Sequence, residues 1–147
     1  MKTFERILVA TDFSPASAPA FEQAVKIAKR DAAPLLITHA YLEPALVELS
    51  QAPATVYAEW DQEIREAVKE KLQPLVEDAR KEGVEAEGLI LMGFADEAII
   101  KAAKQHGVDL IVMGTHGRRG AARMFLGSVA ARVIAAAPCP VMTVRSP

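Results

Sequence analysis

The segment LIVMGTHGRRGAARMFLGS, residues 110–128, decides the fold of this chain. It begins with an unbroken apolar run at residues 110–113, continues into a glycine-rich stretch, and ends at Gly127-Ser128, where helical periodicity resumes. Continuous apolar runs of this length are typical of strands that helices cover on both faces, as in parallel sheets. The segment therefore predicts one strand, loop and helix of an α/β fold.

Four more runs of this kind lie along the chain, at residues 6–10, 35–40, 87–92 and 141–144. Between them, helical periodicity predicts helices at 14–30, 55–82, 95–106 and 127–136. Pro74 lies inside the second helix, where a missing hydrogen bond predicts a kink or a break. We expect one α/β domain over residues 1–147: a five-stranded parallel sheet with helices on both faces, Rossmann-like in architecture.

Composition excludes several classes of protein. The 147 residues are 51% hydrophobic and carry a formal net charge of −2, so the chain lacks the positive surplus that binds nucleic acid nonspecifically. No apolar stretch approaches the roughly 20 residues that span a bilayer, which argues against a membrane protein. The single cysteine, Cys139, cannot form an internal disulfide, and no leader-like segment precedes residue 7. We expect a cytoplasmic protein.

The glycine-rich segment predicts an anion site. Glycine at a strand-to-helix junction lets backbone amides approach a phosphate closely, and the helix N-terminus adds unpaired N–H donors. The hydroxyl of Ser128 can donate a further hydrogen bond, and Arg118 raises the local positive charge in an acidic chain. We expect Gly117→Val or Gly127→Val to abolish ligand binding while leaving the fold intact.

Asp12 follows the first strand, at the sheet edge where open α/β folds bind ligands. Its carboxylate could accept from ribose hydroxyls or hold Mg²⁺. If Asp12 and the Gly114 loop share a site, the first and fourth strands are neighbours, and right-handed crossovers then predict the strand order 3-2-1-4-5.

General motifs leave the ligand open. The loop has neither the G-x-x-x-x-G-K-[ST] pattern nor the spacing of G-x-G-x-x-G. Asp12, His116 and Ser128 are the residue types of a hydrolase triad, but no G-x-S-x-G elbow presents the serine. We interpret His39 as a hydrogen-bonded histidine at a strand end and Cys139 as a packed side chain.

The spacing Gly114-x-x-Gly117, nine residues, Gly127-Ser128 resembles the signature of the ATP-binding branch of the universal stress protein family. The resemblance extends over nearly the whole chain, from the opening ILVATD at residues 7–12 to the closing CPVMTV at residues 139–144. It implies ATP as ligand and a homodimer formed through the last strand, with Val141, Met142 and Val144 as interface candidates.

The resemblance and the reasoning above give one set of expected site residues. The ATP-binding residues are expected to be Thr11, Asp12, Ala40, Met113, Gly114, His116, Gly117, Arg118, Gly127, Ser128 and Val129, with Asp12 also as the Mg²⁺ ligand. No catalytic residue is assigned, because no side chain stands out as a base for activating water.

Three functions remain open at this stage. The first is a binding module of the stress response, in which ATP orders residues 117–126 for recognition by an unknown protein partner. The second is a slow Mg²⁺-dependent ATPase. The third is nucleotidyl transfer, although the S-G-G-x-D-S type of loop expected after the first strand is replaced by Asp12-Phe13-Ser14-Pro15. Residues 43–54 carry no motif that assigns them a role.

Overall fold

The predicted strands form one parallel sheet in the computed structural model, which describes residues 2–42, 53–116 and 126–147. Within these residues the sheet has five strands in the order β3-β2-β1-β4-β5, as the sequence predicted. The strands are β1 (Ile7–Ala10), β2 (Leu35–Tyr41), β3 (Ala86–Met92), β4 (Leu110–Gly114) and β5 (Val141–Val144). β1 lies at the centre, with Ile7 opposite Leu35 on one side and Leu110 on the other.

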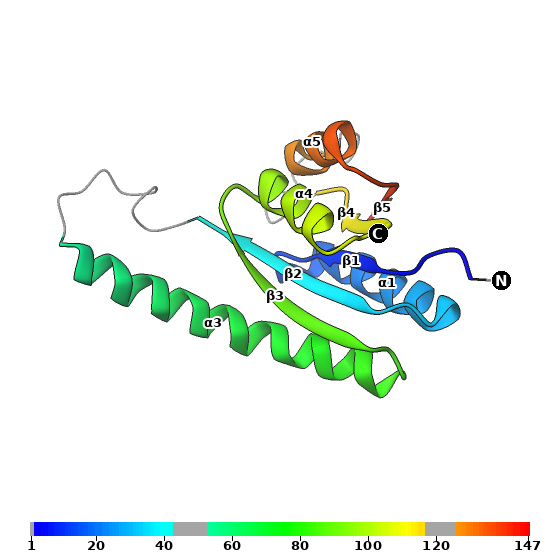
Figure 1. The fold of residues 1–147 in the computed structure, drawn as a ribbon, viewed down its shortest axis with the longest axis horizontal. Helices are drawn as coiled ribbons and strands as arrows, with labels where there is room; N and C mark the ends of the chain where they lie inside the picture. The colour runs from blue at the N-terminus through cyan, green and yellow to red at the C-terminus, as the bar shows by residue number, and fades with distance from the viewer. Residues whose placement is uncertain (1, 43–52, 117–125) are drawn as a thin grey trace.

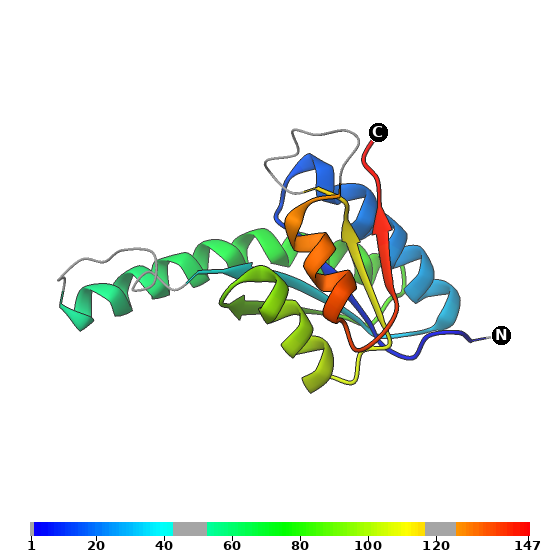
Figure 2. The ribbon, with the colours of Figure 1, turned by 90° about the horizontal axis from the view of Figure 1, so that it is seen from above.

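Helices cover both faces of this sheet. They are α1 (Ala18–Asp31), which follows a short 3-10 turn at Pro15–Ser17, α3 (Ala54–Lys81), α4 (Ala95–Gln105) and α5 (Ser128–Ala136). α1 and α3 pack on one face and α4 and α5 on the other (Figures 1 and 2). Side chains alternate along β1: Ile7 and Val9 belong to the core under α1 and α3, and Leu8 to the core under α4 and α5.

Two expectations about helices change. We expected either a kink or a break at Pro74. The helix α3 continues through Pro74, so it has no break there. Gly127 is the N-cap of α5, so the helix begins one residue later than expected. The expectations for residues 43–52, including the role left open for them, lie outside the described residues. Within the described parts, none of the helices combines the length and the apolar composition that spanning a membrane requires.

Two aspartates fix the segment that leads into β1. Asp31, at the end of α1, accepts the backbone N–H groups of residues 3 and 4 at 3.3 and 2.9 Å. Asp109, just before β4, accepts those of residues 5 and 6 at 2.8 and 2.9 Å. These four bonds anchor the central strand at its amino end, so its carboxyl end enters the site from a fixed position.

Candidate functional site

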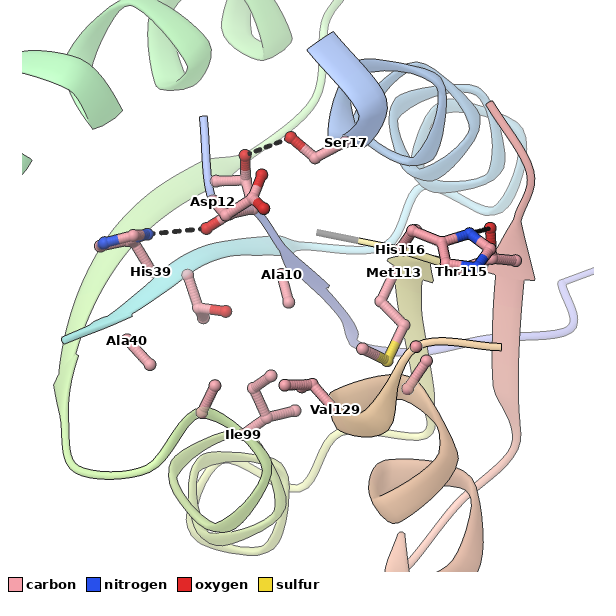
Figure 3. A pocket seen from close by; sticks show the side chains of 16 residues that line it. Ala10, Asp12, Ser17, His39, Ala40, Ile99, Met113, Thr115, His116 and Val129 are labelled. Carbon is pink, nitrogen blue, oxygen red and sulfur yellow. Dashed lines mark hydrogen bonds between the residues drawn. The ribbon is translucent and has the colours of Figure 1, made fainter. Parts of the chain in front are cut away.

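A cavity of about 150 Å³ opens at the carboxyl ends of β1 and β4, where the strand order reverses (Figure 3). Ligands of open α/β sheets bind at this kind of switch point. Eight of the eleven expected site residues line it: Thr11, Asp12, Ala40, Met113, Gly114, His116, Gly127 and Val129. The structure therefore brings these eight residues together around one cavity.

The remaining three expected residues are not among the described residues that line the cavity. Ser128 begins α5 but is exposed and does not line the cavity. The N-cap of α5 is Gly127, so Ser128 is the first residue of the helix and does not hold the N-cap position. Gly117 and Arg118, with the rest of residues 117–125 of the loop expected to be ordered by ATP, lie outside the described residues.

The turn after β1 has an unusual backbone. Phe13 has a φ of 64°, a left-handed conformation that a bulky residue rarely adopts. Hydrogen bonds hold the turn: the N–H of Phe13 donates to Thr11 Oγ1 at 3.0 Å, and the N–H of Ser14 donates to Asp12 Oδ1 at 2.9 Å. Thr11 Oγ1 also lies 3.0 Å from Ser17 Oγ. The Asp12 carboxylate is thus held at the cavity wall by its own turn.

His39 lies on β2 and faces the same turn. Its Nδ1 is 2.8 Å from the carbonyl oxygen of Thr11, and since a carbonyl only accepts, Nδ1 carries the proton of this bond. The interpretation of His39 as a hydrogen-bonded histidine is confirmed, although the side chain also lines the cavity (Figure 3). In the described residues, no group of three or more histidines, cysteines or acids is placed to hold a metal ion.

The opposite wall is built where β4 ends and α5 begins. The N–H of Gly127 donates to the carbonyl oxygen of Thr115 at 2.7 Å, and the N–H of Thr115 donates to Val144 of β5 at 3.3 Å. The start of α5 is thereby held against the end of β4. The amides of residues 128–130, in the first turn of α5, have no acceptor within the helix because helix geometry provides none there.

His116 carries an unsatisfied polar atom. Its Nδ1 lies 3.1 Å from the hydroxyl oxygen of Thr115 (Figure 3), whereas its Nε2 is buried and has no hydrogen-bond partner. Among the described residues this is the sole buried side-chain nitrogen or oxygen without one. Buried polar atoms in native proteins are nearly always paired, so this atom lacks the partner that such an atom usually has.

Eight further residues line the cavity, half of them apolar and half polar, and the sequence reasoning did not assign them to the site. The missed residues are Ala10, Ser17, Thr38, His39, Ala95, Ile99, Thr115 and Ala130. Ala95 and Ile99 come from α4, which contains no glycine, and neither of the two side chains is polar. The available signal was the small residues at the starts of helices that follow β3 and β4, since those helices begin at the ligand edge of the sheet.

Comparison with known proteins identifies this arrangement. The family model described as the universal stress protein family matches residues 3–145. The chain belongs to that family. Universal stress protein YxiE of Bacillus subtilis is 38% identical over 97% of this chain and 99% of its own length. The structure of universal stress protein UspA from Lactobacillus plantarum has a TM-score of 0.86 and 28% identity, covering 99% of this chain and 100% of that one.

Two solved structures similar to this universal stress protein family member contain nucleotides. One is a universal stress protein in complex with cAMP, with a TM-score of 0.71, 26% identity, and coverage of 99% of this chain and 100% of that chain. The other, from Archaeoglobus fulgidus, is in complex with dAMP, with a TM-score of 0.70, 27% identity, and coverage of 96% and 98%. Nucleotide binding therefore occurs among close structural relatives.

Proposed function

We propose that this protein binds ATP in the cavity between β1 and β4 and acts as a nucleotide-dependent binding module of the stress response. The observation that carries the proposal is the buried, unpartnered Nε2 of His116. If Thr115 donates its hydroxyl proton to Nδ1, Nε2 carries the imidazole proton and can donate to an anionic oxygen of the ligand. The first-turn amides of α5 and its dipole add further preference for negative charge.

The rest of the cavity suits the nucleoside part of such a ligand. Small or apolar side chains from three strands and two helices form most of the wall, among them Ala40, Ile99 and Val129. A flat heterocycle buries its faces favourably against such a wall, and polar groups at the edges fix its orientation. The carboxylate of Asp12 and the hydroxyls of Thr11 and Ser17 supply hydrogen-bonding groups on the opposite side. The complexes of relatives with cAMP and dAMP support an adenine nucleotide as the ligand class.

A binding module is preferred to an ATPase for a chemical reason. Hydrolysis needs a group that orients the attacking water. Of the described acids and histidines that line the cavity, Asp12 is held by Ser14 and Nδ1 of His39 is held by Thr11, while Nε2 of His116 is the proposed donor to a ligand oxygen. Asp12 remains our proposed contact for Mg²⁺, since Mg²⁺ is commonly held by one or two carboxylates together with substrate phosphates. The ion would supply charge neutralisation of the phosphates.

The assembly and the compartment belong to the same proposal. β5 pairs with β4 on one side and is the edge of the sheet on the other, which leaves backbone groups available for a second copy. We propose a homodimer through Val141, Met142 and Val144 of β5. The cytoplasm is the proposed location, because its reducing conditions suit a chain with one unpaired cysteine.

The test is to denature the purified protein, identify released nucleotide by chromatography, and titrate the stripped protein with ATP in the presence and absence of Mg²⁺. Stoichiometric binding with ATP recovered unchanged supports the module. Catalytic release of ADP would instead support the slow ATPase. Absence of both co-purified nucleotide and measurable ATP binding would overturn the proposal.

A further inference from the structure

α1 and α3 cover the face of the sheet opposite to α4 and α5 (Figure 1). Residues of both α1 and α3 line a groove on this face. Two adjoining cavities of about 630 and 390 Å³ form it, and Phe21, Glu22 and Asp78 line both of them. The larger cavity is the end nearer to the turn after β1, because Phe13 and Ser14 line it.

The floor of the larger cavity is apolar and incompletely covered. Phe13, Phe21 and Leu75 pack against the core but remain only partly buried. Side chains of this kind release water on contact with an apolar partner, at roughly 25 cal/mol for each Å² buried. The groove therefore offers an anchoring surface for an apolar side chain.

Some of the charged side chains around this floor have a partner and others have none among the described residues. Lys71 lies with its Nζ 5.6 Å from the centroid of the Phe13 ring, and Lys29 pairs with Glu82 at 3.2 Å at the far end of the groove. Glu22 and Asp78, by contrast, have no ion-pair partner within the described chain. The larger cavity thus presents two carboxylates and one amine. The smaller cavity, which Glu22 and Asp78 also line, adds Lys26 and the Lys29–Glu82 pair. The negative surplus lies beside the apolar floor.

The groove and the nucleotide cavity share a wall. Thr11 and Ser17 line both spaces, while the adjacent Asp12 and Phe13 line one each. The Phe13 ring also contacts His39, a residue of the nucleotide cavity, with ring centroids 4.6 Å apart. Phe13 is held in a left-handed conformation between the two spaces, and strained residues of this kind are often part of switching elements.

We propose that the groove between α1 and α3 binds a partner segment that places one basic side chain between Glu22 and Asp78 and one apolar side chain against Phe13, Phe21 and Leu75. The turn from Asp12 to Ser14 couples this binding to occupancy of the nucleotide cavity. The coupling rests on the proposed function, whereas the groove itself does not. By linkage, a ligand that changes the conformation of this turn changes the affinity of the groove, and the reverse holds equally.

The experiment uses the full chain labelled with ¹⁵N and the probe peptide acetyl-Leu-Arg-Leu-amide. Titration followed by amide chemical shifts should perturb residues around the groove, such as Phe21, Lys71 and Leu75. The same peptide with glutamine in place of arginine should bind about tenfold more weakly, because a charge-assisted bond is lost. A second titration with ATP present should change the affinity for the arginine peptide by about fivefold or more.

Matched variants assign the effect to the two carboxylates. The double variant Glu22→Gln, Asp78→Asn removes both charges with almost no change in shape and should reduce binding of the arginine peptide to that of the glutamine peptide. Glu70→Gln makes the same kind of change on α3 outside the groove and should leave binding unchanged.

Each outcome bears on one part of the proposal. Equal binding of both peptides, or binding that survives the double variant, would overturn the groove assignment. An unchanged affinity in the presence of bound ATP would overturn the coupling. Failure of ATP to shift the amides around its cavity would overturn the proposed function, while the peptide titration without ATP still decides the groove.

Discussion

The backbone N–H of Gly127 donates a 2.7 Å hydrogen bond to the carbonyl oxygen of Thr115, and the same oxygen would lie 2.9 Å from a Cβ placed on Gly127. That distance is shorter than real Cβ contacts allow, and the neighbouring atom belongs to the backbone. Glycine is therefore required at position 127 for the approach of two segments of the chain. Its amide is already used within the protein.

Gly127→Ala should destabilise the protein by about 1–3 kcal/mol, the usual cost of overpacking a closely fitted position. Backbone conformation contributes nothing, because φ is −64° and alanine adopts it readily. Thermal or urea unfolding measures the change, with Ser128→Ala as control, since Ser128 is exposed and should change stability by less than about 0.5 kcal/mol. The same steric contact predicts that Gly127→Val also destabilises the fold, whereas the sequence alone led us to expect an unaffected fold. Equal stability of the two alanine variants would contradict this interpretation.

The glycine pattern shows both the strength and the limit of the sequence. It predicted a close approach of the backbone to a phosphate near Gly114 and Gly127, and both residues line the cavity. It could not show which atoms approach the glycine. A glycine that makes room for a phosphate and a glycine that makes room for a backbone carbonyl look the same in the sequence. Only the coordinates distinguish the two.

His116→Leu should have opposite effects on stability and on ATP affinity. Removing the buried, unpartnered Nε2 relieves a desolvation cost of about 1–3 kcal/mol, so the ligand-free protein should be as stable as the wild type or more stable. ATP affinity should fall by about tenfold or more, because the proposed charge-assisted bond is lost. His116→Gln, which retains a polar group on a longer side chain, should lose less affinity. Calorimetric titration and thermal unfolding measure the two effects, and unchanged affinity of the leucine variant would remove His116 from the site.

Asp31 makes the folding stability of the protein depend on pH in the acidic range. The side-chain hydrogen bond from Arg30, opposed by burial and assisted by the N–H of Phe4, holds the pKa of this carboxyl well below its usual range. As pH falls, the carboxyl of Asp31 is therefore protonated in the unfolded state before it is protonated in the folded state. Its contribution to folding stability is complete above the ordinary pKa of about 3.9 and is lost as pH falls below that value. Asp31→Asn should be less stable than the wild type at neutral pH and should lose less stability between about pH 4 and pH 2. Chemical unfolding across this range tests it, and parallel acid profiles would refute the assignment.

Tyr41 joins the end of β2 to α3. Its hydroxyl donates to Asp61 Oδ1 at 2.5 Å and accepts from Arg65 Nη1 at 3.3 Å. Burial, reinforced by the bond to Asp61, raises the pKa of the phenol. Its contribution to stability is therefore complete below the ordinary tyrosine pKa of about 10 and is lost as pH rises beyond it.

Tyr41→Phe should cost about 0.5–1.5 kcal/mol at neutral pH, the net value of a typical hydrogen bond. Because the variant lacks the ionisable phenol, its stability should fall less than that of the wild type above pH 10 or so. Urea unfolding at pH 7 and at alkaline pH measures both effects. A wild-type protein whose alkaline stability loss matches that of the variant would contradict the raised pKa.

The sheet order was predictable because it followed from one pairing, that of the strand before Asp12 with the strand before Gly114. The bonds of Asp31 and Asp109 to residues 3–6 were not, since they join residues 27 to 104 positions apart and leave no local pattern. The contribution of Ile99 to the cavity could not be predicted either. An apolar residue on a helix face predicts packing in the core, and the sequence does not show that part of this core also forms the wall of the site.

The proposed dimer can be tested at Thr143, in the middle of β5. The N–H of Thr115 donates to the carbonyl oxygen of Val144, so the backbone of Val144 faces β4. Backbone groups alternate in direction along a strand, and those of Thr143 therefore face the open edge. Thr143→Pro removes this outward N–H while sparing the pairing with β4, and should convert a dimer into a monomer. Thr143→Val keeps the N–H and the branched shape and should remain dimeric. Sedimentation equilibrium distinguishes the two, and a proline variant that is folded and still dimeric would show that the copies associate through another surface.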